Sequence, residues 1–193
     1  NNEPYIDGQL TEYANMKKHT VDGIGDIYVA QGKEGLYIAA KVNDDDVWTD
    51  GEAWHSGDMG QKGQNDDFRI FVASTDDAEN RVTLCLSAAN LLRVYEPGTT
   101  LEDKGLEKKN LLYQKMLEDY SYRVTTKGLT NVEEGGASNG FDLELYISYT
   151  DLGIDPEDMF LCFDYNNITK TSGTKTATDH YFSKTNQANS ELD

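Results

Sequence analysis

The chain lacks long hydrophobic runs, has few basic residues and contains only 3 prolines among its 193 residues. A helix that crosses a bilayer needs about 18 or more apolar residues in succession, and no stretch of this sequence approaches that length. The 17 Lys and Arg residues stand against 35 Asp and Glu residues, so the net charge is -18. This charge repels nucleic-acid backbones and anionic lipid headgroups, so neither nucleic acid nor a membrane is an expected partner.

Cysteine and histidine are also scarce, with 2 and 3 copies. Cys85 and Cys162 lie in apolar, strand-like runs, where a cysteine is usually a small buried hydrophobic residue. Two free thiols are therefore favoured over a disulfide, although the sequence leaves both open. Because there is no Cys-x-x-Cys motif, thiol redox chemistry and Cys/His zinc sites are disfavoured.

Signal and enzyme motifs are missing as well. The first residues have neither a basic cluster nor an apolar stretch, so the chain is either cytoplasmic or a fragment of a longer secreted protein. The sequence contains no Gly-x-Ser-x-Gly, no His-Glu-x-x-His and no phosphate-binding loop. Among 35 carboxylates, a pair at glycosidase separation would arise by chance. We therefore expect no enzymatic activity.

What the sequence does contain is a series of short strand patterns. Residues 141–147 alternate strictly, which places Phe141, Leu143, Leu145 and Ile147 on one inner face. Similar patterns predict further strands at 26–31, 36–42, 68–73, 81–87, 91–96, 120–126 and 159–165.

Helical patterns are few. A short helix is expected over Leu10–Lys18 and a capped helical turn over 150–156, while 101–118 fits either a helix or a ragged strand. The tail from residue 166 is expected to be loop, apart from a short strand at 180–182. The balance of strands and helices predicts an all-β fold, an antiparallel two-sheet β-sandwich with one or two short helices.

A long polar segment, residues 43–64, interrupts the strands. It is rich in Gly and Asp and contains both tryptophans, Trp48 and Trp54. Loops longer than about 12 to 15 residues without structure of their own are uncommon in compact domains and are often functional. This segment is therefore the first place to look for a binding site.

Four segments in order resemble a known family. Tyr5–Tyr13 is similar to the opening I-D-G-x-L-D-E-x-W of family 9-like carbohydrate-binding modules, and Gly35–Asp44 resembles the strand that follows it. Asn65–Val72 and Gly140–Gly153 are similar to two later strands of these modules. The resemblance covers nearly the whole chain and extends to the wider DOMON-type β-sandwiches. It implies a jelly-roll-like β-sandwich, structural calcium and sugar recognition in extracellular multidomain proteins.

The resemblance also shapes the expected context of the chain. Residues 1–193 would form a single carbohydrate-binding-module-like domain, excised from a larger secreted or cell-surface bacterial protein. Its partners would be a glycan ligand and the neighbouring modules of that parent protein.

The chain departs from the family in its aromatic residues. Members that bind xylan and cellulose hold the sugar between two tryptophans from separated parts of the chain, but here both tryptophans share one loop. The second wall would have to come from Tyr165, Tyr181 or Phe182, which are candidates by position only. Tyr149 replaces a further family tryptophan, so the identity of the sugar cannot be inherited from the family.

A sugar site needs an exposed aromatic face and side chains that exchange hydrogen bonds with hydroxyl groups. We expect Trp54 to be the leading stacking residue, with Trp48 as a second candidate. The expected hydrogen-bond partners come from the same loop: Asp58, Gln64 and Asn65. The alternative interpretation is that a tryptophan packs under the loop as its hydrophobic anchor.

Carboxylates gather at both ends of this loop. Asp44, Asp45 and Asp46 lie at its start and Asp67 follows it, and calcium binds about six to eight oxygen ligands. The sequence therefore predicts structural calcium at these four residues. The alternative is a solvated acidic loop, because neighbouring strand residues point to opposite faces and the spacing is not that of an EF-hand.

Two function classes remain open. The first is a non-catalytic glycan-binding module that tethers a larger extracellular protein to polysaccharide, and we favour it. The second is a calcium-stabilised structural or adhesive spacer of a bacterial surface protein that binds no sugar. Haem ligation, known in some DOMON-type domains, is disfavoured because the Met and His residues have no diagnostic spacing.

Overall fold

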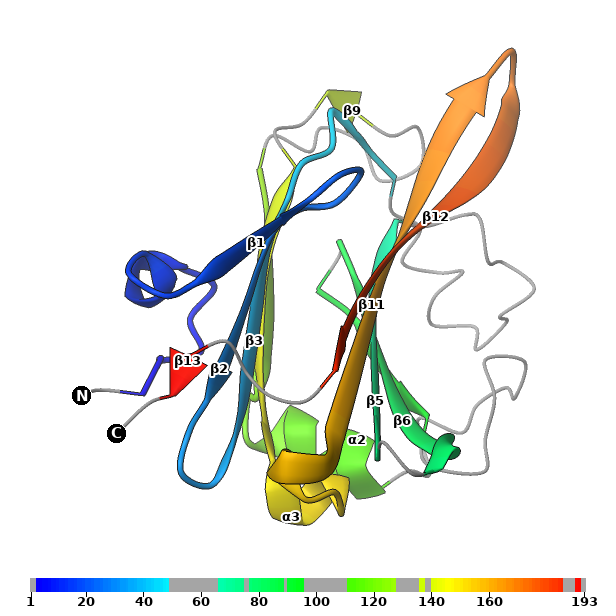
Figure 1. Ribbon diagram of the computed structural model, residues 1–193. Helices are drawn as coiled ribbons and strands as arrows, with labels where there is room; N and C mark the ends of the chain where they lie inside the picture. The colour runs from blue at the N-terminus through cyan, green and yellow to red at the C-terminus, as the bar shows by residue number, and fades with distance from the viewer. Residues whose placement is uncertain are drawn as a thin grey trace.

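The computed structural model describes residues 3–48, 66–74, 77–88, 90–95, 111–127, 136–137, 140–185 and 190–191. These residues form two main sheets that face each other across one hydrophobic core (Figure 1). Neighbouring strands are antiparallel except for a short parallel pair at the C-terminus. The predicted fold class, an all-β two-sheet sandwich with short helices, is confirmed.

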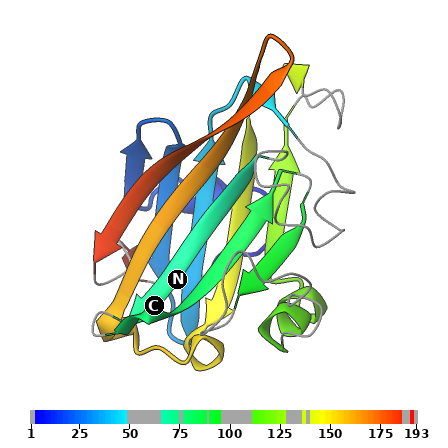
Figure 2. The same cartoon turned by 90° about the vertical axis from the view of Figure 1, so that its right-hand side faces the viewer.

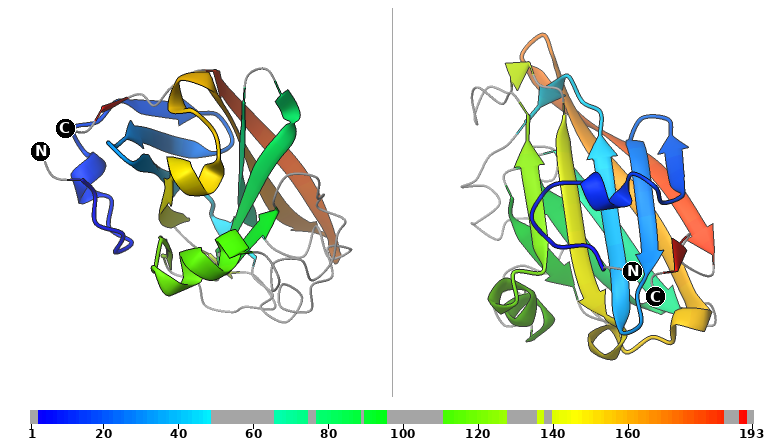
Figure 3. Two further views of the ribbon diagram at one scale, coloured as in Figure 1. Left: turned by 90° about the horizontal axis from the view of Figure 1, so that it is seen from below. Right: turned by 90° about the vertical axis from the view of Figure 1, so that its left-hand side faces the viewer.

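The first sheet has six strands, seen from its outer side in Figure 3. Its order is β1 (Lys18–Val21), β2 (Gly25–Gln31), β3 (Gly35–Val42), β10 (Phe141–Ser148) and β8 (Tyr122–Thr126), and β13 (Ser190–Glu191) pairs with β2 in parallel.

The second sheet has five strands and is seen face-on in Figure 2. Its order is β12 (Thr174–Thr185), β11 (Met159–Thr171), β5 (Asp67–Ser74), β6 (Asp77–Ser87) and β7 (Leu92–Tyr95). A separate pair joins β4 (Asp46–Val47) to β9 (Gly136–Ala137).

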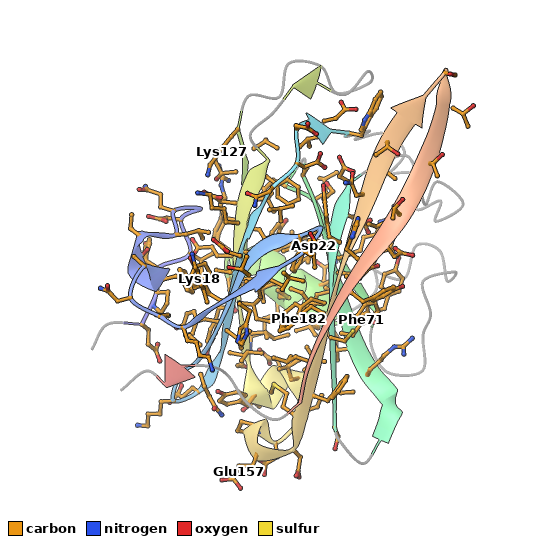
Figure 4. All side chains as sticks on the ribbon, turned by 45° about the horizontal axis from the view of Figure 1, so that its top comes forward. Lys18, Asp22, Phe71, Lys127, Glu157 and Phe182 are labelled. Atoms are coloured by element: carbon orange, nitrogen blue, oxygen red, sulfur yellow. The ribbon has the colours of Figure 1, made fainter. Side chains whose placement is uncertain are left out.

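The core follows from the strand alternation. The inward residues Phe141, Leu143, Leu145 and Ile147 of β10 are all at most 2% exposed, as the sequence predicts. Aromatic rings meet between the sheets, since the Phe141 ring centroid lies 5.8 Å from that of Tyr165 on β11. Side chains fill the space between the sheets, and the exposed Glu157 lies at the periphery (Figure 4).

The tail corrects one sequence prediction. Residues after 166 are not mostly loop, because β11 continues to Thr171 and pairs with β12 over its full length. Ser172 and Gly173 form the tight connection, and both have positive φ angles, 51° and 84°. Such a turn suits the twist of a hairpin. The hairpin extends past the other strands (Figure 2). It therefore has few apolar residues, and its sequence pattern is typical of a loop.

The helices are short. The predicted helix at Leu10–Lys18 is only a 3-10 turn, η1 (Thr11–Tyr13), and β1 follows it. The ambiguous region contains α2 (Leu111–Glu118), which buries Leu112 and Met116 on one face. The predicted helical turn is confirmed as α3 (Tyr149–Leu152), followed by η3 (Pro156–Asp158). Within the described residues, no helix has the length and apolar character to cross a membrane.

The two cysteines are not joined by a disulfide. Cys85 is fully buried on β6, and burial raises the pKa of its thiol to about 12. A thiol with so high a pKa is not ionised at neutral pH, which agrees with the expectation that it is a small buried hydrophobic residue.

Candidate ligand-binding site

The loop that carries the predicted sugar contacts begins and ends at one point of the fold. The Asp66 amide donates a hydrogen bond to the Trp48 carbonyl (2.8 Å), and the Trp48 amide donates to the Asp66 carboxylate. The other oxygen of that carboxylate accepts from the Ile168 amide on β11 (2.6 Å). Asp66 is fully buried, and burial raises the pKa of its carboxyl to about 8. Asp66 therefore clamps both ends of the loop to the second sheet.

The loop itself falls largely outside the described residues. The predicted sugar contacts Trp54, Asp58, Gln64 and Asn65 all lie there, so these assignments remain predictions.

The aromatic residues predicted to contact sugar, where the structure describes them, fall into a buried and an exposed group. Trp48 is 3% exposed and Tyr165 is fully buried, so neither ring offers a face to a sugar. The Tyr165 hydroxyl donates to Asp44 (2.5 Å), and Phe182 stacks on Phe163 beside the core. Trp48 and Tyr165 thus have structural roles in place of the sugar contacts expected from the sequence. Tyr181, at 62% exposed, remains available.

The predicted calcium ligands do not converge. One oxygen of Asp44 accepts from the Asp46 amide (2.9 Å) and the other from Tyr165, while Asp67 forms an ion pair with Arg69. Asp45 is exposed. Among the residues that the structure describes, no three Asp, Glu, His or Cys side chains gather as a metal ion requires. The described carboxylates therefore do not form a calcium site by themselves. Structural calcium remains a prediction from the sequence.

The outer face of the second sheet carries a buried ion-pair network centred on Arg69, which is 2% exposed. Its guanidinium donates twice to Asp67, through Nε (2.8 Å) and Nη2 (3.1 Å). Nη1 lies 3.5 Å from Asp164 and 3.9 Å from Asp179. Burial and, after it, the neighbouring Asp179 together raise the pKa of Asp164 to about 8. The network fixes β5, β11 and β12 to one another beneath Tyr181.

A second region, on the opposite side of the sandwich, has the features of a binding site. The N-terminal segment crosses the outer face of the first sheet (Figure 3, right). A cavity of about 540 Å³ lies there, between this segment and side chains of β3 and β10. We call it the tyrosine pocket, and its lining includes Tyr5, Tyr37, Tyr120, Tyr146, Asp119 and Ser121.

The tyrosines of this pocket come from four separate elements. Tyr37 on β3 and Tyr146 on β10 are opposite each other in the strand register, and their ring centroids are 4.8 Å apart. Tyr5 of the N-terminal segment is 76% exposed, and Tyr120 after α2 is 82% exposed. Two rings that belong to the sheet are thus accompanied by two rings that face solvent.

The N-terminal segment is held to the sheet by Glu144. Its carboxylate, on the outer face of β10, accepts hydrogen bonds from the Asp7 (2.5 Å) and Gly8 (2.6 Å) amides. Gly8 has φ +86°, and a Cβ atom there would lie 2.4 Å from the Thr125 hydroxyl oxygen, so only glycine fits. The Tyr37 hydroxyl adds a hydrogen bond to Glu3 (2.9 Å). These contacts keep Tyr5 at the pocket.

Tyr120 occupies an unfavourable backbone position. After α2, the Ser121 amide bonds to the Met116 carbonyl (3.0 Å) and the Tyr120 amide to the Leu117 carbonyl (3.3 Å). This is the Schellman pattern, in which the residue at the position of Tyr120 is left-handed and usually glycine. Tyr120 has φ 52°, a conformation that costs a residue with a side chain about 1 to 2 kcal/mol. A large, exposed ring at a strained position has no evident role in folding.

This strain gives a testable prediction. Tyr120→Gly is expected to raise the free energy of unfolding by about 1 kcal/mol, or the melting temperature by about 2 to 4 °C, because glycine relieves the left-handed strain. Thermal and urea denaturation measure the change. Tyr120→Ala is the control, since it removes the ring but keeps the strain and should give no gain. A loss of stability in the glycine variant would show that the ring stabilises the fold.

Sequence reasoning missed the tyrosine pocket. It places Tyr120 in a strand and predicts stacking on Trp48, Trp54, Tyr165 or Tyr181, although the chain has 12 tyrosines and only 2 tryptophans. The high number of tyrosines is the feature of the sequence that could have indicated this pocket. Tyr5 was noted only as part of the family-like opening segment.

The fold and the pocket together define an all-β, two-sheet sandwich with an aromatic surface site. No known protein family and no curated protein matches this chain in sequence. In structure, it is similar to a protein from Bacteroides uniformis that is proposed to bind carbohydrate. The TM-score is 0.57 at 12% sequence identity, and the match covers 90% of this chain and 80% of the other. This likeness shows the fold.

Proposed function

We propose that the chain is a non-catalytic glycan-binding module and that the tyrosine pocket is its binding site. Sugars present patches of C–H bonds that pack on aromatic rings, together with hydroxyl groups that exchange hydrogen bonds with polar side chains. The pocket supplies the exposed rings of Tyr5 and Tyr120, the half-buried ring of Tyr146 and the exposed Asp119 carboxylate. Its volume of about 540 Å³ lies within the range of small-molecule sites, about 300 to 1,000 Å³.

The observation that carries this proposal is Tyr120. Its ring is 82% exposed and its backbone is left-handed, so neither burial nor local conformation favours tyrosine there. Strained residues cluster at functional sites, and an observed outlier is a reason to look for a function. A ligand that stacks on the exposed ring would account for the residue.

The structural relative supports the same function, since the Bacteroides uniformis protein of similar fold is itself proposed to bind carbohydrate. In a larger extracellular or cell-surface bacterial protein, such a module would tether its neighbours to polysaccharide. Binding at one pocket would be weak, and several modules together would raise the effective affinity.

Affinity gel electrophoresis tests the proposal. The wild type is run through gels that contain starch, xylan, β-glucan, mannan or pectin, and at least one of these polymers is expected to retard it. Tyr120→Ala should weaken the interaction about tenfold or more, because it removes an exposed aromatic contact. Tyr181→Ala separates the two exposed tyrosine sites: retardation should be unchanged in this variant if the glycan binds at the tyrosine pocket, and lost if it binds beside Tyr181 on the other sheet.

Two results would change the assignment. If retardation persists in Tyr120→Ala but disappears in Trp54→Ala, the glycan binds at the long loop, as expected from the sequence. If no polymer retards the wild type, the glycan proposal fails and the spacer interpretation gains weight.

A further inference from the structure

The tyrosine pocket has charge of one sign only. Asp119 is exposed at its rim, and the described lining residues include no Lys, Arg or His. Asp119 follows the last turn of α2 and its amide donates to the Lys115 carbonyl (2.9 Å), so the backbone holds it beside Tyr120. A ligand in the pocket therefore meets a fixed negative charge.

The surroundings of the pocket are negative as well. Glu3 accepts the hydrogen bond of the Tyr37 hydroxyl. Burial raises the pKa of Tyr146, and nearby carboxylates raise it further: Glu3, Glu34 and Asp151. Lys115 is a cation that acts on Tyr146, and its ammonium group is bound to Asp151 at 2.8 Å. Asp151 thus offsets the positive charge of Lys115.

We infer that the tyrosine pocket selects neutral and amino sugars over acidic sugars, with Asp119 as a specificity-determining residue. This inference rests on the proposed function of the same pocket. Two like charges close to each other repel in water, and they repel more strongly where water is partly excluded. A uronate or sulfate group beside Asp119 would meet this repulsion, whereas a hydroxyl group could donate a hydrogen bond to the carboxylate. A protonated amino group would be attracted.

The test uses one polymer in three forms. The neutral polymer that retards the wild type is compared with its carboxymethyl derivative and with its hydroxyethyl derivative, which has similar bulk but no charge. For the wild type, affinity for the carboxymethyl form is expected to be about five to ten times weaker than for the hydroxyethyl form at low salt. Added salt should narrow this difference because it screens the repulsion.

Variants that change the charge at position 119 test whether Asp119 causes the difference in affinity. Asp119→Asn should bring the two derivatives close to equal affinity, and Asp119→Lys should reverse their order. Glu118→Gln is the matched control, because Glu118 is the exposed neighbour outside the pocket lining and the variant changes the net charge equally. An unchanged preference in Asp119→Asn, or an equal change in Glu118→Gln, would overturn the role of Asp119.

The outcomes also separate this inference from the proposed function. Binding that depends on Tyr120 but does not discriminate between the two derivatives would overturn the inference and leave the glycan site in place. Absence of binding to every neutral polymer would overturn both. Binding of choline in that case would assign the pocket to quaternary ammonium ligands, which aromatic cages also accept.

Discussion

Replacing Arg69 by methionine is expected to lower the free energy of unfolding by about 3 to 5 kcal/mol, the usual effect of removing one partner from a buried ion pair. The guanidinium is a positive charge in contact with Asp67, Asp164 and Asp179, and its side chain is 3% exposed. Methionine fills much of the volume but leaves the carboxylates of the second sheet without this charge. Urea or guanidinium denaturation measures the loss.

The matched control is Arg81→Met on the neighbouring strand. Arg81 is exposed and lies over the Phe71 ring at 5.5 Å, so its loss should cost at most about 1 kcal/mol. The cost of Arg69→Met should also shrink at acidic pH, where the carboxylates left behind can take up protons. A cost below about 1 kcal/mol at neutral pH would mean that water reaches the network and screens it.

Much of the fold could be predicted because the alternation of apolar and polar residues along a strand indicates which side chains are buried. The 141–147 pattern predicted the inner face of β10, and the patterns at 26–31 and 36–42 predicted β2 and β3. Apolar and polar residues do not alternate in a strand that has no buried face, so such a strand cannot be recognised from its sequence. The β11–β12 hairpin is held by backbone pairing in its outer half, and exposed threonines there give no apolar period.

The sites were less predictable, because they depend on which strands pair. Tyr37 and Tyr146 are 109 positions apart in the sequence and meet only through the β3–β10 register. Asp44 and Asp67 were grouped as calcium ligands from their position along the chain, yet each has a different partner, Tyr165 or Arg69. A local excess of carboxylates therefore does not reveal whether a cation or the protein itself satisfies them.

The stability of the domain is expected to fall as the pH rises from about 4 to 8. Burial raises the pKa of Asp66 and Asp164 to about 8 and that of Glu144 to about 7. In the unfolded chain these groups titrate near pH 4. Between the pKa of the unfolded chain and that of the folded state, the folded state binds more protons than the unfolded chain. As the pH rises through this range, each group can therefore lower the free energy of unfolding by up to about 1.4 kcal/mol per pH unit.

Denaturation in urea at pH 5 and at pH 8 measures this slope, and Asp164→Asn isolates one contributor. Asparagine resembles the protonated carboxyl: its oxygen can accept from the His180 amide, as Asp164 does at 3.1 Å, and its NH2 group can donate toward Asp179. The variant should therefore exceed the wild type in stability by much more at pH 8 than at pH 5. The exposed Asp45→Asn, which removes the same charge from the surface, should shift both values by less than about 0.5 kcal/mol. If both variants flatten the slope equally, repulsion from the net charge of -18 is the cause, and the buried carboxylates are not.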